Sequence, residues 1–213
     1  MSVQVKICGL TEEVGLETCL DQRVDWIGFN FFARSPRYVT PARAAQLASL
    51  FDKAPAGPGC VGLFVEPSDA DIADVLSVTS LDVLQLYTSA ERAREIRATF
   101  ECKVWLSCPV SSETDLPVTT DVDRLIVESR PPQTSGRPGG NGIAFPWGLT
   151  REWKAPVPWL LAGGLRPENV AHAIAESGAA AVDVASGVES APGIKDPEAI
   201  VRFVAAARGT VGA

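Results

Sequence analysis

Short apolar runs rich in β-branched residues alternate along the chain with amphipathic helical segments. The eight runs predicted to be strands span residues 3–8, 26–31, 60–64, 83–86, 103–107, 124–127, 159–162 and 181–185. Helical patterns are predicted at residues 11–21, with Thr11 as the cap, and at 41–51, 68–78, 89–100, 167–177 and 197–208. Strands that alternate with helices are typical of a parallel sheet with helical crossovers. Eight such units predict an α/β fold, a single closed (β/α)8 TIM barrel.

The fifth and sixth units lack a convincing helix. Residues 111–118 contain too few periodic apolar positions, and residues 128–145 are rich in proline, glycine and polar residues. We therefore expect degenerate helical layers after strands five and six. We also expect residues 130–139 to be poorly ordered without ligand, because a long loop in a compact domain is usually functional or disordered. No linker-like segment divides the chain, so residues 1–213 are predicted to form one domain.

Composition narrows the classes of partner. The formal net charge of −7 argues against nucleic acid and anionic membranes as partners, and no apolar run is long enough to span a bilayer. The five cysteines include no Cys-x-x-Cys pair, which favours free thiols in a reducing compartment and hence a cytoplasmic protein. With His172 as the only histidine, a zinc or iron site is not expected. The sequence leaves open whether the protein is a monomer or a homodimer.

Strand alternation places polar side chains inside the predicted barrel. The inward-facing polar and thiol residues are Lys6, Cys8, Gln85, Tyr87, Glu128 and Asp183. An inert barrel interior would consist of branched apolar residues, and barrel enzymes place their catalytic groups at the carboxyl ends of the strands. Strands one and eight are neighbours in a closed barrel. We therefore predict an ion pair between Lys6 and Asp183 beneath Cys8, because an unpaired buried charge is strongly unfavourable. Its role would be structural support.

Glycine-rich loops follow the last three predicted strands. They contain residues 139–142, the pair Gly163-Gly164 and the pair Ser186-Gly187. The loops after strands seven and eight commonly form a phosphate site in such barrels. Glycine lets the main chain approach closely enough for several backbone N–H groups to donate to phosphate oxygens. The sequence therefore predicts a phosphate-containing ligand, most simply a sugar phosphate.

Motifs spread over nearly the whole chain resemble those of the phosphoribosylanthranilate isomerase family. Each motif is weak alone, but their order and spacing are specific. They occupy residues 6–11, 28–29, 35–37, 61–65, 84–86, 139–142, 161–165, 167–170, 182–184, 186–189 and 193–196. The resemblance implies an Amadori rearrangement in tryptophan biosynthesis. The substrate would be N-(5-phosphoribosyl)anthranilate and the product 1-(2-carboxyphenylamino)-1-deoxyribulose 5-phosphate. It also implies that no cofactor or metal is needed, because an iminium intermediate is itself the electron sink.

The resemblance also assigns roles to individual residues. Cys8 matches the family's general base, and Glu128 stands where the family has its general acid. Arg37 matches the residue that holds the anthranilate carboxylate. The remaining expected substrate contacts are Gln85, Gly140, Asn141, Gly163, Gly164, Ser186 and Gly187.

The chain departs from the family pattern near the expected active site. Glu128 replaces an aspartate, Tyr87-Thr88 replaces His-Gly, Pro146 replaces an aspartate, and Ala185 replaces a serine. These departures leave open an alternative, a catalytically weakened or silent paralogue that binds sugar phosphates. Another phosphate-binding barrel enzyme is a third interpretation. A turnover assay separates the first two, since both share every binding feature.

Overall fold

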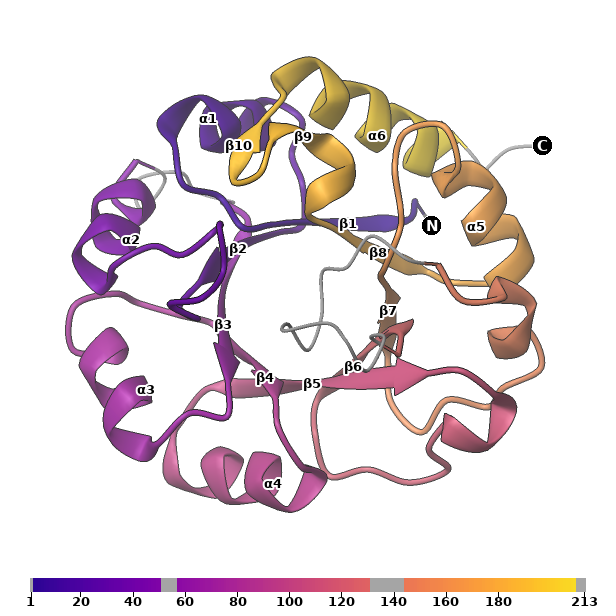
Figure 1. The fold of residues 1–213 in the computed structure, drawn as a ribbon, viewed down its shortest axis with the longest axis horizontal. Helices are drawn as coiled ribbons and strands as arrows, with labels where there is room; N and C mark the ends of the chain where they lie inside the picture. The colour runs from indigo at the N-terminus through magenta and orange to yellow at the C-terminus, as the bar shows by residue number, and fades with distance from the viewer. Residues whose placement is uncertain (1, 51–56, 131–143, 210–213) are drawn as a thin grey trace.

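The computed structural model describes residues 2–50, 57–130 and 144–209. Eight strands pair in sequence order, and β1 also pairs with β8, so that they close a parallel barrel (Figure 1). The strands are β1 (Gln4–Cys8), β2 (Trp26–Asn30), β3 (Gly59–Val65), β4 (Val83–Tyr87), β5 (Lys103–Val110), β6 (Arg124–Ser129), β7 (Trp159–Leu161) and β8 (Ala181–Val184). This confirms the predicted barrel and places all eight predicted strands within a few residues of their expected bounds.

The described residues form six α-helices, which lie outside the ring of strands (Figure 1). They are α1 (Glu13–Asp21), α2 (Pro41–Ala48), α3 (Asp69–Leu76), α4 (Ala90–Thr99), α5 (Val170–Ser177) and α6 (Pro197–Gly209). Between β5 and β6 there is only the 3-10 turn η1 (Glu113–Asp115). Between β6 and β7 the described residues contain only the 3-10 turn η2 (Trp147–Thr150). The predicted degenerate layers are confirmed there. Within the described segments, no helix has both the length and the apolar character that crossing a membrane requires.

Two helices begin later than the sequence predicts. Helix α1 starts at Glu13, and Thr11 is not its cap, because the Thr11 hydroxyl instead donates to the carbonyl of Gly193 at 2.7 Å. Helix α5 starts at Val170 rather than at residue 167. The side chain of Asn169 holds the preceding turn, since its Nδ2 donates to the carbonyl of Gly164 and its Oδ1 accepts from the N–H of Arg166.

The floor of the barrel is apolar, whereas its mouth is polar. A buried inner cluster comprises Val61, Val83, Trp105, Ile126, Leu160, Ala162 and Ala181. The guanidinium of Arg124 lies 4.9 Å from the ring centre of Trp26 and 5.5 Å from that of Trp105, both of which pack at this end. The inner residues that come later in the strands include the charged and thiol groups of Cys8, Glu128 and Asp183. This division leaves the chemistry to the carboxyl ends, as the strand alternation predicts.

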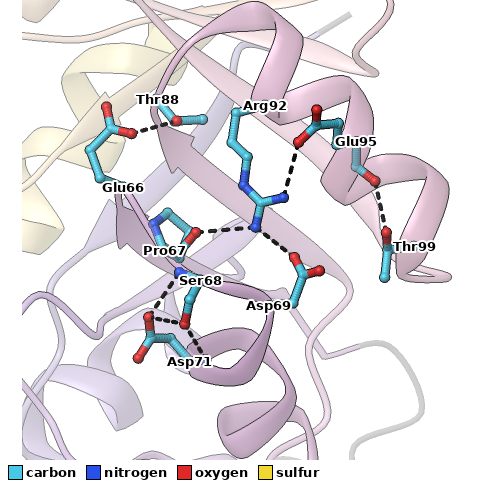
Figure 2. A network of polar contacts seen from close by, with 9 residues as sticks. All are labelled: Glu66, Pro67, Ser68, Asp69, Asp71, Thr88, Arg92, Glu95 and Thr99. Carbon is cyan, nitrogen blue, oxygen red and sulfur yellow. Dashed lines mark hydrogen bonds and ion pairs between the residues drawn. The ribbon is translucent and has the colours of Figure 1, made fainter.

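A network of polar contacts fixes the carboxyl ends of β3 and β4 (Figure 2). Arg92 of α4 donates to the carbonyl of Pro67 at 3.3 Å and forms an ion pair with Asp69 at the start of α3. Glu66, which follows β3, accepts from the hydroxyl of Thr88 at 2.7 Å and donates its own N–H to the carbonyl of Tyr87. Glu66 makes these two contacts with a backbone φ angle of 44°, a conformation that is uncommon for residues other than glycine. Glu66 therefore holds the end of β4 through two contacts, one to the carbonyl of Tyr87 and one to the side chain of Thr88.

Candidate active site

A pocket of about 750 Å³, including the open space at its entrance, lies at the carboxyl end of the barrel. Its wall brings together Cys8, Asn30, Phe32, Ser35, Arg37, Leu63, Val65, Tyr87, Glu128, Ala162, Gly163, Gly164, Leu165, Asp183, Val184, Ala185 and Ser186. Within the described part of the chain, no three His, Cys, Asp or Glu side chains are grouped so that they could hold a metal ion.

The predicted ion pair below Cys8 is present. Nζ of Lys6 lies 2.9 Å from Oδ1 of Asp183, and both residues are buried and face each other in the β1–β8 register. Burial disfavours the charge on Lys6, but the carboxylate of Asp183 and the sulfur of Cys8 together outweigh burial and raise the pKa of Lys6. Lys6 therefore remains a cation inside the barrel, directly below the thiol.

Two opposing effects act on the thiol of Cys8. Burial raises its pKa, whereas the charges of Lys6 and Lys195 lower it, and the net shift is upward. Glycine at position 28 makes room for this arrangement. A Cβ atom there would lie 2.9 Å from Sγ of Cys8 and 3.3 Å from Nζ of Lys6, so a larger residue would displace both groups.

The carboxyl group of Glu128 is buried, and hydroxyl groups from β5 and β4 approach it. Oγ of Ser107 on β5 donates to Oε1 of Glu128 at 2.7 Å. Tyr87 on β4 lines the same pocket, and its phenol interacts with this carboxyl. Burial, followed by the nearby charge of Glu128, raises the pKa of Tyr87 well above its ordinary value. The phenol therefore stays protonated and remains a donor.

Arg37 reaches the pocket but shares its guanidinium with a carboxylate of the protein. Its Nε and Nη2 donate to the two carboxylate oxygens of Glu189, at 2.7 and 2.8 Å. Nζ of Lys195 lies 2.9 Å from Oε1 of the same Glu189. Burial raises the pKa of Glu189, but Arg37 and Lys195 outweigh burial and lower it. One edge of the guanidinium is thus occupied, and only its Nη1 has no hydrogen-bond partner among the described residues.

The glycine-rich loops after β7 and β8 meet at one side of the pocket. Gly163 and Gly164 have φ angles of 85° and 67°, which glycine adopts without strain. A Cβ atom at Gly187 would lie only 1.8 Å from the carbonyl oxygen of Leu165, so glycine there lets the two loops pack together. Gly164 and Ser186 line the pocket. Two other predicted phosphate contacts, Gly140 and Asn141, lie outside the described residues, as does most of the predicted loop 130–139.

Among the predicted contacts that the structure describes, Gln85 and Gly187 do not line the pocket wall. Gln85 is fully buried one layer below Tyr87, because a side chain two residues earlier on the same strand faces the same way at a greater depth. Neither amide atom of Gln85 has a hydrogen-bond partner among the described residues.

Three contributing residues were not predicted as site residues. Ser107 shares the inner face of β5 with Trp105, so strand alternation could have identified it. Glu189 and Lys195 belong to the short strands β9 (Glu189–Ala191) and β10 (Ile194–Lys195), which follow the barrel and carry no periodic signal.

Comparison with known proteins agrees with this geometry. The family model for N-(5'-phosphoribosyl)anthranilate (PRA) isomerase matches residues 5–206. The isomerase of that name from Acidiphilium cryptum is 49% identical over 205 residues, which cover 96% of this chain and 98% of the relative.

Two solved structures are each 30% identical to this chain. In both cases the similarity spans 97% of this chain and 99% of the solved chain. One contains monomers generated from the dimeric phosphoribosylanthranilate isomerase of Thermotoga maritima and superposes with a TM-score of 0.78. The other is a phosphoribosylanthranilate isomerase in complex with reduced 1-(o-carboxyphenylamino)-1-deoxyribulose 5-phosphate, with a TM-score of 0.79. The family match and the 49% identity, each over nearly the full length, lead to one conclusion: this chain belongs to the N-(5'-phosphoribosyl)anthranilate isomerase family.

Proposed function

We propose that this isomerase of tryptophan biosynthesis converts N-(5'-phosphoribosyl)anthranilate to 1-(2-carboxyphenylamino)-1-deoxyribulose 5-phosphate with Cys8 as general base and Glu128 as general acid. The observation that carries the proposal is the convergence of a thiol, a buried carboxyl and the two glycine-rich loops on one pocket. The full-length similarity to enzymes of this name favours an active isomerase over a silent paralogue.

In the first step, the Glu128 carboxyl gives its proton to the ring oxygen of the ribose. The C1–oxygen bond then breaks, and the nitrogen lone pair forms a protonated Schiff base. The hydrogen bond from Ser107 and the protonated phenol of Tyr87 beside it support this role, because both stabilise the carboxylate that remains.

In the second step, the thiolate of Cys8 removes the proton from C2 of the ribose. The electron pair of that C–H bond flows to the iminium, which gives an enolamine, and the enolamine tautomerises to the aminoketose. The thiolate must form inside a buried site, and the adjacent cations of Lys6 and Lys195 favour it. Lys6 is itself held by Asp183, so this pair acts as structural support for the base.

The ends of the substrate are held at opposite parts of the pocket. The remaining edge of Arg37 would bind the anthranilate carboxylate, while Glu189 fixes the orientation of the guanidinium. The loops with Gly163, Gly164, Ser186 and Gly187 would bind the phosphate through backbone N–H groups, supplemented by Gly140 and Asn141. Gln85 lies one layer below Tyr87 on β4, and it would support the substrate site indirectly, through that strand.

The decisive experiment is turnover of the authentic substrate. Purified protein mixed with N-(5'-phosphoribosyl)anthranilate should produce a loss of anthranilate fluorescence that is proportional to enzyme concentration and is not increased by added metal ions. Protein that binds a product analogue without turnover would instead support the silent-paralogue interpretation.

A bulky replacement of Gly164 should abolish the protection that inorganic phosphate gives against thermal unfolding. A side chain at its φ of 67° is strained and moves the loop away from the anion. We expect the midpoint temperature of unfolding of the parent protein to rise with phosphate concentration. The midpoint temperature of the Gly164→Val variant should stay constant.

Gly178→Val is the matched control. Gly178 has a φ of 73°, at the carboxyl end of α5, with no atom within 4 Å of a Cβ there, and it does not line the pocket. It therefore carries similar strain without touching the proposed site, and its phosphate response should match that of the parent. Full protection of Gly164→Val would contradict the phosphate site.

Compartment and assembly are further proposals. All five cysteines of the chain are free thiols, which supports a reducing compartment and hence the cytoplasm. The enzyme would consist of one domain over residues 1–213 and act as a monomer or a homodimer, and light scattering on the purified protein distinguishes these two states.

A further inference from the structure

Tyr87 lies in the pocket wall and is directed at the group that the proposed mechanism uses as its acid. It stands at the last position of β4 and lines the same cavity as Glu128, two strands away. Its phenol interacts with the carboxyl of Glu128, and that carboxyl accepts a hydrogen bond from Ser107 on the intervening strand at 2.7 Å. Two hydroxyl groups from different strands therefore converge on one buried carboxyl.

The backbone at Tyr87 is fixed independently of this contact. The N–H of Glu66 donates to the carbonyl of Tyr87. The hydroxyl of Thr88 donates to the carboxylate of Glu66 (Figure 2). Arg92 holds the neighbouring start of α3 through Pro67 and Asp69. The phenol thus comes from a strand end with little freedom to move, which is the condition for a preorganised donor.

We propose that Tyr87, together with Ser107, is a positioning residue that holds the Glu128 carboxyl toward the ribose ring and stabilises the negative charge left there after Glu128 donates its proton. The proposal rests on the acid role of Glu128 proposed above. A carboxylate left behind in a buried pocket is unfavourable unless hydrogen-bond donors face it. The raised pKa of Tyr87 keeps the phenol protonated throughout the working pH range, so it donates a hydrogen bond and does not itself ionise.

The Tyr87→Phe variant tests this role while keeping the ring. We expect kcat to fall by about 10- to 100-fold, the range for losing one hydrogen bond to a charged group, with KM nearly unchanged. Ser107→Ala should have an effect in the same direction. Tyr38→Phe is the matched control, because Tyr38 is the only other tyrosine of the sequence, is exposed and does not line this pocket. It should retain the parent kcat.

A double-mutant cycle separates positioning of Glu128 from a general structural effect. In a Glu128→Ala background, measured in single turnovers with excess enzyme, Tyr87→Phe should cause no further loss of rate, because the group it positions is absent. An equal loss in both backgrounds, or a raised KM with an unchanged kcat, would overturn the positioning role. If Glu128→Ala loses turnover and Tyr87→Phe does not, only the positioning role fails. If Glu128→Ala keeps the parent rate, the proposed acid itself is wrong, whatever Tyr87→Phe does.

Discussion

Replacing Cys8 with alanine is expected to lower kcat by about 10²–10⁴-fold, the usual contribution of a positioned general base. KM should change little, because the thiolate acts on the C2 proton only after the substrate has bound and the ring has opened. The thiol lines the pocket directly above the Lys6–Asp183 pair, and the charges of Lys6 and Lys195 act on it. The measurement is steady-state kinetics followed by anthranilate fluorescence.

The pH dependence gives a second signature of the same base. Burial raises the pKa of the Cys8 thiol, so little thiolate is present at neutral pH in the free enzyme. Since the thiolate is the active form, kcat/KM of the parent should rise with pH through the neutral and mildly alkaline range. The residual activity of Cys8→Ala should lack this rise.

Cys102→Ala is the matched control for the loss of a thiol. Cys102 is partly buried, does not line the pocket, and its Sγ lies against the carbonyl of Leu81. This variant should keep the parent rate and the parent pH profile. A Cys8→Ala enzyme with more than about a tenth of the parent kcat would mean that another group removes the C2 proton.

The barrel was predictable because its signals are local and repeated. Most strands combine β-branched residues with a face alternation, and the alternation alone placed Lys6 opposite Asp183 and Glu128 at the mouth. The weak fifth and sixth helical layers were predictable for the converse reason, since their segments lack apolar periodicity. Helix starts were less accurate, because Thr11 and Asn169 use their side chains to hold loops rather than to cap helices.

The contacts between loops could not be read from the sequence. Glu189 takes one edge of the Arg37 guanidinium although the two residues are 152 positions apart, so the whole fork of Arg37 seemed available for substrate. The pair can form only because β9 and β10 bring Glu189 and Lys195 back over the mouth. The depth of a side chain within the barrel could not be read from the sequence either. Gln85 and Tyr87 face the same way, and only the closed barrel shows that Tyr87 alone reaches the pocket.

The other large effect is expected at Glu128. Glu128→Gln keeps the size of the side chain and leaves an amide oxygen that still accepts from Ser107 beside Tyr87, but it has no acidic proton to give. We expect kcat to fall by about 10²–10⁴-fold with KM nearly unchanged, as for removal of a general acid. Glu128→Ala should lose at least as much, because it also leaves the two hydroxyl groups without their acceptor.

Glu152→Gln serves as the control, since Glu152 is exposed and does not line the pocket, and its kcat should match that of the parent.

The Glu128→Gln variant is the prediction on which the proposed chemistry depends. The carboxyl is one methylene longer than the aspartate of the family pattern, and a displacement of about 1 Å can change a rate by about 10²-fold. Ser107 and Tyr87 hold the longer side chain in one place, so the parent should be an active enzyme despite the change. If Glu128→Gln and the parent turn over equally, another group protonates the ring oxygen. If neither turns over while both bind a product analogue, the barrel binds sugar phosphates without catalysing their isomerisation.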